Sequence, residues 1–242
     1  MDVTDALKRM RGGLVVSVQA PPESPLAAPE HLAAIARAVE AGGAAGIRAE
    51  GLDALAAIED AVELPVIGLV KRRVAGSEVY ITPALEDALA VVEAGAEFVA
   101  VEATERSRAD GTSGPAFVAA LTAELPGRVV ADVDRASAGR AAASAGAAAV
   151  ATTLSGYVQP DGSAAAGTPR PGEPDVALVA ELAAEHGCPV LAEGRYASPA
   201  HVRAAFEAGA FAVVVGTAIT DPTALTRRLA AATRAGAHGS AG

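Results

Sequence analysis

The sequence predicts a (β/α)8 barrel, in which eight parallel strands alternate with helices and close on themselves. Short apolar runs alternate with longer segments of helical periodicity along the chain, a pattern typical of strands joined by crossover helices. A four-residue motif also recurs before every second strand. The length of 242 residues suits one domain of this architecture. An open, doubly wound sheet is the alternative, because eight strands can also lie flat.

The predicted strands are the apolar runs bounded by turn residues. They span residues 14–19, 45–50, 66–71, 98–103, 129–133, 149–154, 189–194 and 212–217. Because nearly every position in these runs is apolar, both faces of the sheet are expected to be covered, as in a parallel sheet with helices outside it.

Proline marks where several helices begin. It is favoured at the first helical position, since its fixed backbone angle suits the helix and its missing N–H is not needed there. The predicted first positions are Pro29, Pro83, Pro115, Pro174, Pro199 and Pro222, with Thr82, Ser198 and Asp221 as N-caps. Leu85, Leu89 and Val92 share one face of the helix after the third strand, and this face is predicted to lie on the sheet.

The recurring motif has a glycine in third place and occupies residues 40–43, 93–96, 144–147 and 207–210. The glycine is expected to end the helix and turn the chain towards the next strand. The last interval is longer because residues 158–173, rich in Pro, Gly, Ala and Ser, are predicted to form an inserted loop. The predicted domain spans residues 1–235, and residues 236–242 are predicted to be a disordered tail.

Composition argues against several classes of protein. The net charge is −10 and no basic run is longer than residues 71–73, so a nucleic acid partner is not expected. Cys188 is the single cysteine and the four histidines are scattered, so neither a disulfide framework nor a metal site is expected. No long apolar run has the length of a membrane span, and a cytoplasmic protein without a membrane partner is expected.

Every predicted strand ends in a polar residue. In a (β/α)8 barrel the carboxyl ends of the strands meet at one rim, where active sites lie. The residues at these ends are Gln19, Arg48 with Glu50, Lys71, Glu102, Asp132, Thr152 with Thr153, Glu193 with Arg195, and Thr217. Any one of them is as readily a solvated loop residue, but together they predict a functional site at this rim.

Lys71 is the candidate catalytic base. The chain has two lysines against 17 arginines, and lysine, unlike arginine, can lose its proton when it is desolvated. An exposed lysine in a basic turn is the alternative. Glu193 and Asp132 are expected to face it across the rim as acid and base groups. Arg48 and Arg195 suit an anionic ligand, with structural salt bridges as the alternative.

The last two strands end in glycine-containing turns, Glu193-Gly194-Arg195 and Gly216-Thr217-Ala218. Barrels often form a phosphate site there, from backbone amides and a following helix N-terminus. A glycine-rich turn is a weak signal alone, but its place after strands seven and eight favours phosphate binding by Gly194, Gly216 and Thr217.

The chain resembles the N-acylglucosamine-6-phosphate 2-epimerases, also called N-acetylmannosamine-6-phosphate epimerases. The residues that carry the resemblance are 12–20, 42–51, 65–73, 79–83, 102–111, 131–134, 152–157, 191–196 and 213–220. The resemblance implies a phosphate-binding (β/α)8 barrel and an enzyme of sialic acid catabolism that interconverts N-acetylmannosamine 6-phosphate and N-acetylglucosamine 6-phosphate. It also implies a homodimer that acts on a phosphorylated amino sugar without a cofactor or metal.

The resemblance also implies a role for each rim residue. Lys71 would move the proton at C2 of the open-chain sugar, and Glu193 would reprotonate that lysine or act as the second proton-transfer group. The sugar would be positioned by Gln19, Arg48 and Asp132, and Arg195 would support the site. The phosphate would be bound by Gly194, Gly216 and Thr217.

Three departures from the family pattern keep other functions open. Glu102 stands where the family usually has Asp, so a substrate contact from the fourth strand is expected to shift. Glu50 replaces the usual Asn and adds a negative charge beside Arg48, and residues 158–173 lengthen a loop expected near the substrate. One alternative is another phosphosugar isomerase, or a lyase with Lys71 as a Schiff base. The other is a barrel that binds sugar phosphate without catalysis.

Overall fold

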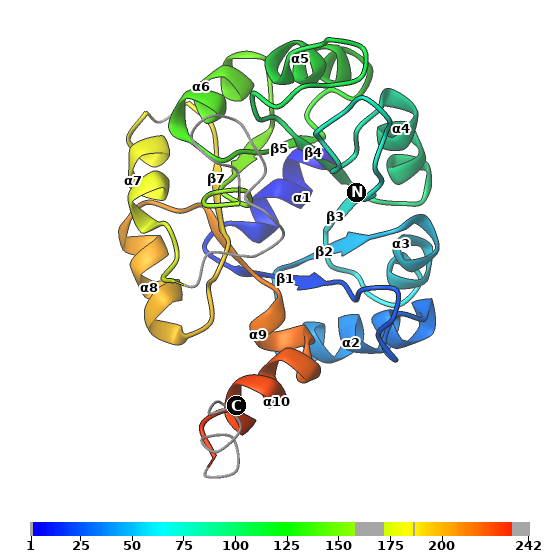
Figure 1. The fold of residues 1–242 in the computed structure, drawn as a ribbon, viewed down its shortest axis with the longest axis vertical. Coiled ribbons are helices and arrows are strands. Elements are labelled where there is room, and N and C mark those ends of the chain that lie inside the picture. Colours follow the sequence, from blue (N-terminus) through cyan, green and yellow to red (C-terminus); the bar gives the residue numbers. More distant parts are fainter. Residues whose placement is uncertain (1, 158–171, 186, 234–242) are drawn as a thin grey trace, which may run out of the picture.

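The computed structural model describes residues 2–157, 172–185 and 187–233, and eight parallel strands in it form one closed barrel in sequence order (Figure 1). The predicted (β/α)8 architecture is therefore confirmed, and an open sheet is excluded because β1 pairs with both β2 and β8. Residues 158–171 of the predicted insertion and the whole predicted tail lie outside the described residues.

All strands except the second are shorter than predicted at their carboxyl ends. They are β1 (Leu14–Val18), β2 (Gly46–Glu50), β3 (Val66–Leu69), β4 (Phe98–Glu102), β5 (Val129–Asp132), β6 (Ala149–Ala151), β7 (Val190–Glu193) and β8 (Ala212–Val215). The largest differences are at β3, β6 and β8, where the chain leaves the ladder before Lys71, Thr152 and Gly216. These residues thus lie in the loops of the rim and not in the strands.

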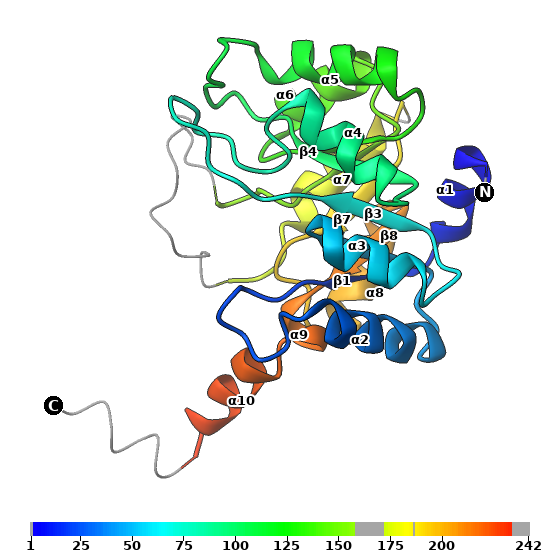
Figure 2. The ribbon, with the colours of Figure 1, turned by 90° about the vertical axis from the view of Figure 1, so that its right-hand side faces the viewer.

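A ring of helices surrounds the barrel (Figure 1). The helices are α1 (Val3–Met10), α2 (Pro29–Ala41), α3 (Leu52–Glu59), α4 (Leu85–Glu93), α5 (Gly114–Glu124), α6 (Ala136–Ser144), α7 (Val176–Ala184), α8 (Pro199–Glu207), α9 (Thr217–Thr220) and α10 (Pro222–Ala230). Figure 2 shows α10 projecting away from the barrel, on the side opposite α1. None of the helices described is both long and apolar enough to cross a membrane.

The proline predictions hold for some helices and fail for others. Pro29, Pro199 and Pro222 begin their helices, and Pro115 is the second residue of α5. Pro83 and Pro174 lie outside the helices that follow them, which have Ala84 and Asp175 as N-caps. Thr82 is not a cap either, because its buried hydroxyl donates a hydrogen bond to the Ala100 carbonyl at 2.7 Å. Ser198 and Asp221 cap α8 and α10 as predicted.

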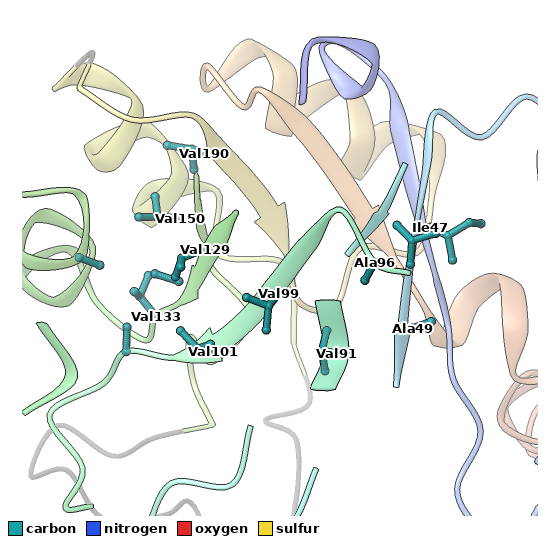
Figure 3. Close-up of a cluster of buried hydrophobic side chains, with 14 of the residues drawn as sticks. Ile47, Ala49, Val91, Ala96, Val99, Val101, Val129, Val133, Val150 and Val190 are labelled. Atoms are coloured by element: carbon teal, nitrogen blue, oxygen red, sulfur yellow. The ribbon is translucent and has the colours of Figure 1, made fainter. Parts of the chain in front are cut away.

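Successive residues of each strand point alternately into the barrel and outward to the helices, and an apolar layer lies on each side. Inward-facing residues such as Val15, Ile67 and Phe98 fill the barrel, and Met10 of α1 joins them at the amino-terminal end of the strands. Outward-facing residues pack against the helices, and Figure 3 shows Ile47, Val99 and Val101 among them. This period of two decides which polar residues at the rim point into the barrel.

The outer layer corrects one predicted helix face. On α4 the fully buried residues are Ala88 and Val91; of the predicted face, Leu85 and Val92 are partly buried against the same core, whereas Leu89 is exposed. Gly68 explains the close packing there, since a Cβ at this position would lie 2.6 Å from Val91 Cγ1 and 2.9 Å from Ala96 Cβ. Small residues such as glycine and alanine therefore allow the helices to pack at a short distance from the strands.

Candidate active site

A cavity of about 820 Å³ opens at the carboxyl ends of the strands. Most of the residues predicted to act there line it: Gln19, Arg48, Glu50, Lys71, Glu193, Gly194, Arg195, Gly216 and Thr217. Gln19, Lys71 and Glu193 keep the inward phase of their strands, since they stand an even number of residues after the interior residues Val15, Leu69 and Leu191. Asp132 and Glu102 do not line the cavity.

A buried ion cluster forms the floor of the cavity. The Arg48 guanidinium donates to both carboxylate oxygens of Asp132, at 3.0 and 2.6 Å. The Oε2 atom of Glu193 lies 3.2 Å from Arg48 Nη1. The side chains of Arg48 and Asp132 are 2% and 0% exposed, so Asp132 acts behind Arg48. Thr153 completes the cluster, because its hydroxyl donates to Asp132 at 2.8 Å.

Glu193 has the carboxyl group that most readily holds a proton in this cluster. Burial raises its pKa, and the negative charge of Asp132 raises it further, whereas Arg48 and Lys71 oppose the shift. Its Oε2 atom is buried and accepts no hydrogen bond from the described residues. A carboxyl group with a raised pKa can give and take a proton near neutral pH.

Lys71 reaches into the same cavity from the loop after β3. Its side chain is accessible from the open cavity, and its ammonium nitrogen donates to Gln19 Oε1 at 2.6 Å. Desolvation lowers the pKa of Lys71, and the positive charge of Arg48 adds to this, whereas Glu50 and Glu193 raise it. The balance lies towards an amine that loses its proton more easily than a free lysine.

Residues 70–82, which we call the rim hairpin, carry Lys71. The segment folds back on itself through the antiparallel bridge between Lys71 and Ile81 and through hydrogen bonds from Arg72 N to Tyr80 O (3.1 Å) and Thr82 N to Val70 O (2.8 Å). Its second half also pairs with β4, since Glu102 N donates to Ile81 O at 3.1 Å. The rim hairpin therefore lies between the ends of β3 and β4, with one half continuing from β3 and the other hydrogen-bonded to β4.

Two of the three departures from the family pattern, Glu50 and Glu102, lie in different surroundings. Glu50 lines the cavity, and its charge acts mainly on Lys71, not on Arg48 as the sequence suggested. Glu102 is fully buried beneath the rim hairpin, where its carboxylate accepts from Tyr80 N at 3.1 Å. The expected substrate contact from Glu102 is therefore corrected to a contact within the protein.

The opposite wall of the cavity comes from β7 and β8. Gly194 has a φ of 106° and Arg195 a φ of 64°, so the chain turns sharply after Glu193. The Arg195 guanidinium donates to the carbonyl of Ser155, which precedes the predicted insertion, at 2.7 Å, and to that of Glu173, its last residue, at 3.1 Å. Arg195 thus joins the two ends of that loop while it lines the cavity.

Among the cavity-lining residues that the sequence reasoning missed are Tyr80, Tyr157 and Arg228. Tyr80 lies in the motif 79–83, but its place could not be read without the pairing of the rim hairpin. Arg228 lies near the end of α10, and only the direction of that helix brings it to the cavity. In the part of the chain that the structure describes, no three His, Cys, Asp or Glu side chains gather as a metal site would require.

Comparisons with known proteins agree on one family. A family model described as "Putative N-acetylmannosamine-6-phosphate epimerase" matches residues 32–235. Two relatives named "Putative N-acetylmannosamine-6-phosphate 2-epimerase" are similar over most of their length. The one from Cutibacterium acnes is 45% identical (90% of this chain, 92% of the relative), and the one from Caldanaerobacter subterraneus subsp. tengcongensis is 40% identical (93% and 92%).

A solved structure is similar as well. It is the N-acetylmannosamine-6-phosphate 2-epimerase from Clostridium perfringens, which is 35% identical to this chain. The two structures superpose with a TM-score of 0.83 over 93% of this chain and 94% of the other.

Proposed function

The chain belongs to the N-acetylmannosamine-6-phosphate epimerase family, and from this premise we propose that it epimerises C2 of N-acetylmannosamine 6-phosphate to give N-acetylglucosamine 6-phosphate. The observation that carries the proposal is a lysine with a lowered pKa and a carboxyl group with a raised pKa in one cavity. Such groups can remove a proton from a carbon next to a carbonyl and return one to it, which is the chemistry of this epimerisation.

The reaction begins on the open-chain sugar. Neutral Lys71 removes the proton at C2, and the electron pair of the C–H bond moves towards the C1 aldehyde oxygen to give an enolate. The Arg48 guanidinium stabilises the negative charge that develops, because it is held in place before the reaction by Asp132. A proton delivered from Glu193 to the opposite face of C2 gives the epimer, and the proton that Lys71 has taken then passes to Glu193 through solvent, which restores both groups.

The remaining rim residues hold the substrate. Gln19 and Arg48 line the cavity and position the sugar, and Asp132 does so through Arg48. The phosphate is assigned to the wall formed by Gly194, Gly216 and Thr217, with Arg195 beside it. This assignment rests on the position of these residues after β7 and β8, where barrels bind phosphate.

The test is proton NMR of N-acetylmannosamine 6-phosphate in deuterated buffer. With the wild-type protein we expect N-acetylglucosamine 6-phosphate to appear with deuterium at C2. The variant Lys71→Ala should lower the rate by about 100- to 10,000-fold, the usual contribution of a general base. The matched control is Lys8→Ala, since Lys8 is the other lysine and lies on the exposed helix α1; it should keep the wild-type rate.

Two outcomes would contradict the proposal. An unchanged substrate in the wild-type sample would remove this epimerisation as the activity. Trapping of the substrate on Lys71 by borohydride would instead favour a Schiff base, because a lysine with a lowered pKa also suits that chemistry.

The assembly and location complete the proposal. A homodimer is proposed because α10 has no buried residue in a single copy and its Leu229 is 66% exposed, which leaves an apolar side chain for a partner to cover. Light scattering after size exclusion should give twice the mass of one chain, and a monomer at working concentration would overturn this. The cytoplasmic location belongs to the same proposal, as the compartment of sugar-phosphate metabolism.

A further inference from the structure

Glu102 is the buried charge of the rim that the proposed reaction does not use. It is the last residue of β4, and its side chain is fully buried. One carboxylate oxygen, Oε2, accepts from Tyr80 N at 3.1 Å. The other, Oε1, accepts from Thr104 Oγ1 at 2.9 Å and from Arg106 Nη1 at 3.1 Å. A buried carboxylate is costly unless it is paired, and here three donors pair it.

A short series of contacts leads from Glu102 to Lys71. Both the carboxylate and the backbone N–H of Glu102 bind the second half of the rim hairpin, the first through Tyr80 N and the second through Ile81 O. Ile81 is in turn the bridge partner of Lys71. Two backbone pairings therefore separate the buried carboxylate from the candidate base.

The rim hairpin depends on this support. β3 ends at Leu69, so Lys71 is not held by the barrel ladder itself. Two antiparallel strands alone are marginally stable in water, and a third strand or a packed face is needed to hold them. Arg106 adds to the support, because its guanidinium also donates to the Glu78 carbonyl and lies 5.8 Å from the centre of the Tyr80 ring.

We propose that Glu102 is a positioning residue, which holds Lys71 in its working place in the cavity by anchoring the rim hairpin to β4. The proposal deepens the function proposed above, since it takes Lys71 as the base. The length of this side chain decides whether it reaches the rim hairpin in this protein. An aspartate would be shorter by one methylene, about 1.5 Å, and its carboxylate would lie beyond hydrogen-bond distance of Tyr80 N.

The test compares the same substitution at two ends of β4. Glu102→Asp withdraws the carboxylate from the rim hairpin. Glu97→Asp is the matched control, because Glu97 immediately precedes β4 and its Oε2 accepts from Val66 N at 3.0 Å, at the opposite end of the barrel. Both variants weaken a bond between a carboxylate and a backbone N–H, but only the first touches the segment that carries Lys71.

The readout is the pKa of Lys71, measured by NMR on protein whose amines carry carbon-13 methyl groups. The chain has two lysines, so two lysine signals are expected, and Lys71→Ala identifies the one from the rim. The charged groups that face Lys71 are Arg48 and Glu50 from β2, Asp132 from β5 and Glu193 from β7. None of them is altered in either variant, so a shift reports the position and hydration of Lys71.

Glu102→Asp should raise the pKa of Lys71 towards that of a free lysine, because a displaced rim hairpin moves the amine away from the cavity wall, whose desolvation lowers the pKa, and away from the positive charge of Arg48. In the unmodified protein kcat should fall by about 10- to 100-fold, as expected for a displaced catalytic group, with less effect on KM. Glu97→Asp should change neither, whatever it does to Tm. A Lys71 pKa and a kcat in Glu102→Asp equal to those of Glu97→Asp would overturn the proposal.

Two further results keep the test decisive. If Glu102→Asp does not fold, Thr104→Val replaces it. This variant keeps the Glu102 carboxylate and removes the hydroxyl that donates to it, together with the acceptor of the Arg106 N–H. It should shift the Lys71 pKa in the same direction by less, and no shift would refute the positioning role. If the wild-type protein does not turn over N-acetylmannosamine 6-phosphate, the proposed function fails. The titration of Lys71 still decides the positioning role, because it needs no substrate.

Discussion

The ion pair between Arg48 and Asp132 allows a quantitative prediction for Asp132→Asn. The change keeps the size of the side chain and removes one negative charge from a site where both partners are almost fully buried. Removing one partner of a buried pair costs about 3–5 kcal/mol, because the other charge stays in the interior. Glu193 remains 3.2 Å from Arg48 and offsets part of the loss, so we expect the lower end, about 3 kcal/mol.

Thermal unfolding followed by circular dichroism measures this loss. For a chain of this size each kcal/mol lowers Tm by about 2–4 °C, so Asp132→Asn should lower it by about 6–12 °C. The matched control is Glu181→Gln, which breaks an ion contact of 3.2 Å to Arg140 on the surface, where the two side chains are 47% and 57% exposed. An exposed pair contributes about 0–1 kcal/mol, so this variant should unfold close to the wild type.

Two results would refute the reasoning about Asp132. If both variants lower Tm equally, burial does not set the contribution of the pair. If Asp132→Asn is more stable than the wild type, desolvation of the carboxylate outweighs its attraction to Arg48. The substitution should also lower the pKa of Glu193, since the charge of Asp132 raises it, and the pH profile of the reaction reports that change.

Two other substitutions, Glu59→Gln and Gly68→Ala, test the electrostatics and the packing of the layer between the strands and the helices. Burial and the nearby Glu97 raise the pKa of Glu59 from 4.5 to about 7, so the folded state loses stability as pH rises from about 4.5 to 7. Glu59→Gln should therefore be more stable than the wild type by about 1–2 kcal/mol at pH 8, after allowance for partial exposure, and no more stable at pH 4 in thermal unfolding. Gly68→Ala should cost about 1–3 kcal/mol in urea unfolding, because the added Cβ would meet Val91 and Ala96 at 2.6 and 2.9 Å; an unchanged midpoint would mean that α4 moves freely.

Much of the site could be predicted because a strand has a period of two. Once a strand is recognised, its polar end residue and the apolar residue two positions earlier must share a face. Asp132 thus follows Val130 into the barrel, and Glu193 follows Leu191. Their meeting with Arg48 follows from closure of the barrel, which brings the ends of distant strands to one rim.

Other expectations failed where local patterns competed with tertiary contacts. Thr82 precedes a proline and has the pattern of an N-cap, but its hydroxyl binds the Ala100 carbonyl between the rim hairpin and β4. Leu89 has the spacing of a buried helix face, yet α4 is rotated so that Ala88 and Val91 pack on the strands. The small residues at this contact, such as Gly68, decide that rotation, and no pattern within the helix contains that information.

The sequence by itself determined the barrel, the rim and the polar residues that reach it, because each of these depends on spacing within one element. Only the tertiary structure decided which partners each of those residues contacts and which group its charge affects. Glu102 belongs to the anchor of the rim hairpin, Glu50 acts on Lys71, and Arg195 joins the ends of a loop. The physical reason is that hydrogen bonds, desolvation and charge depend on distances between elements that lie far apart in the chain.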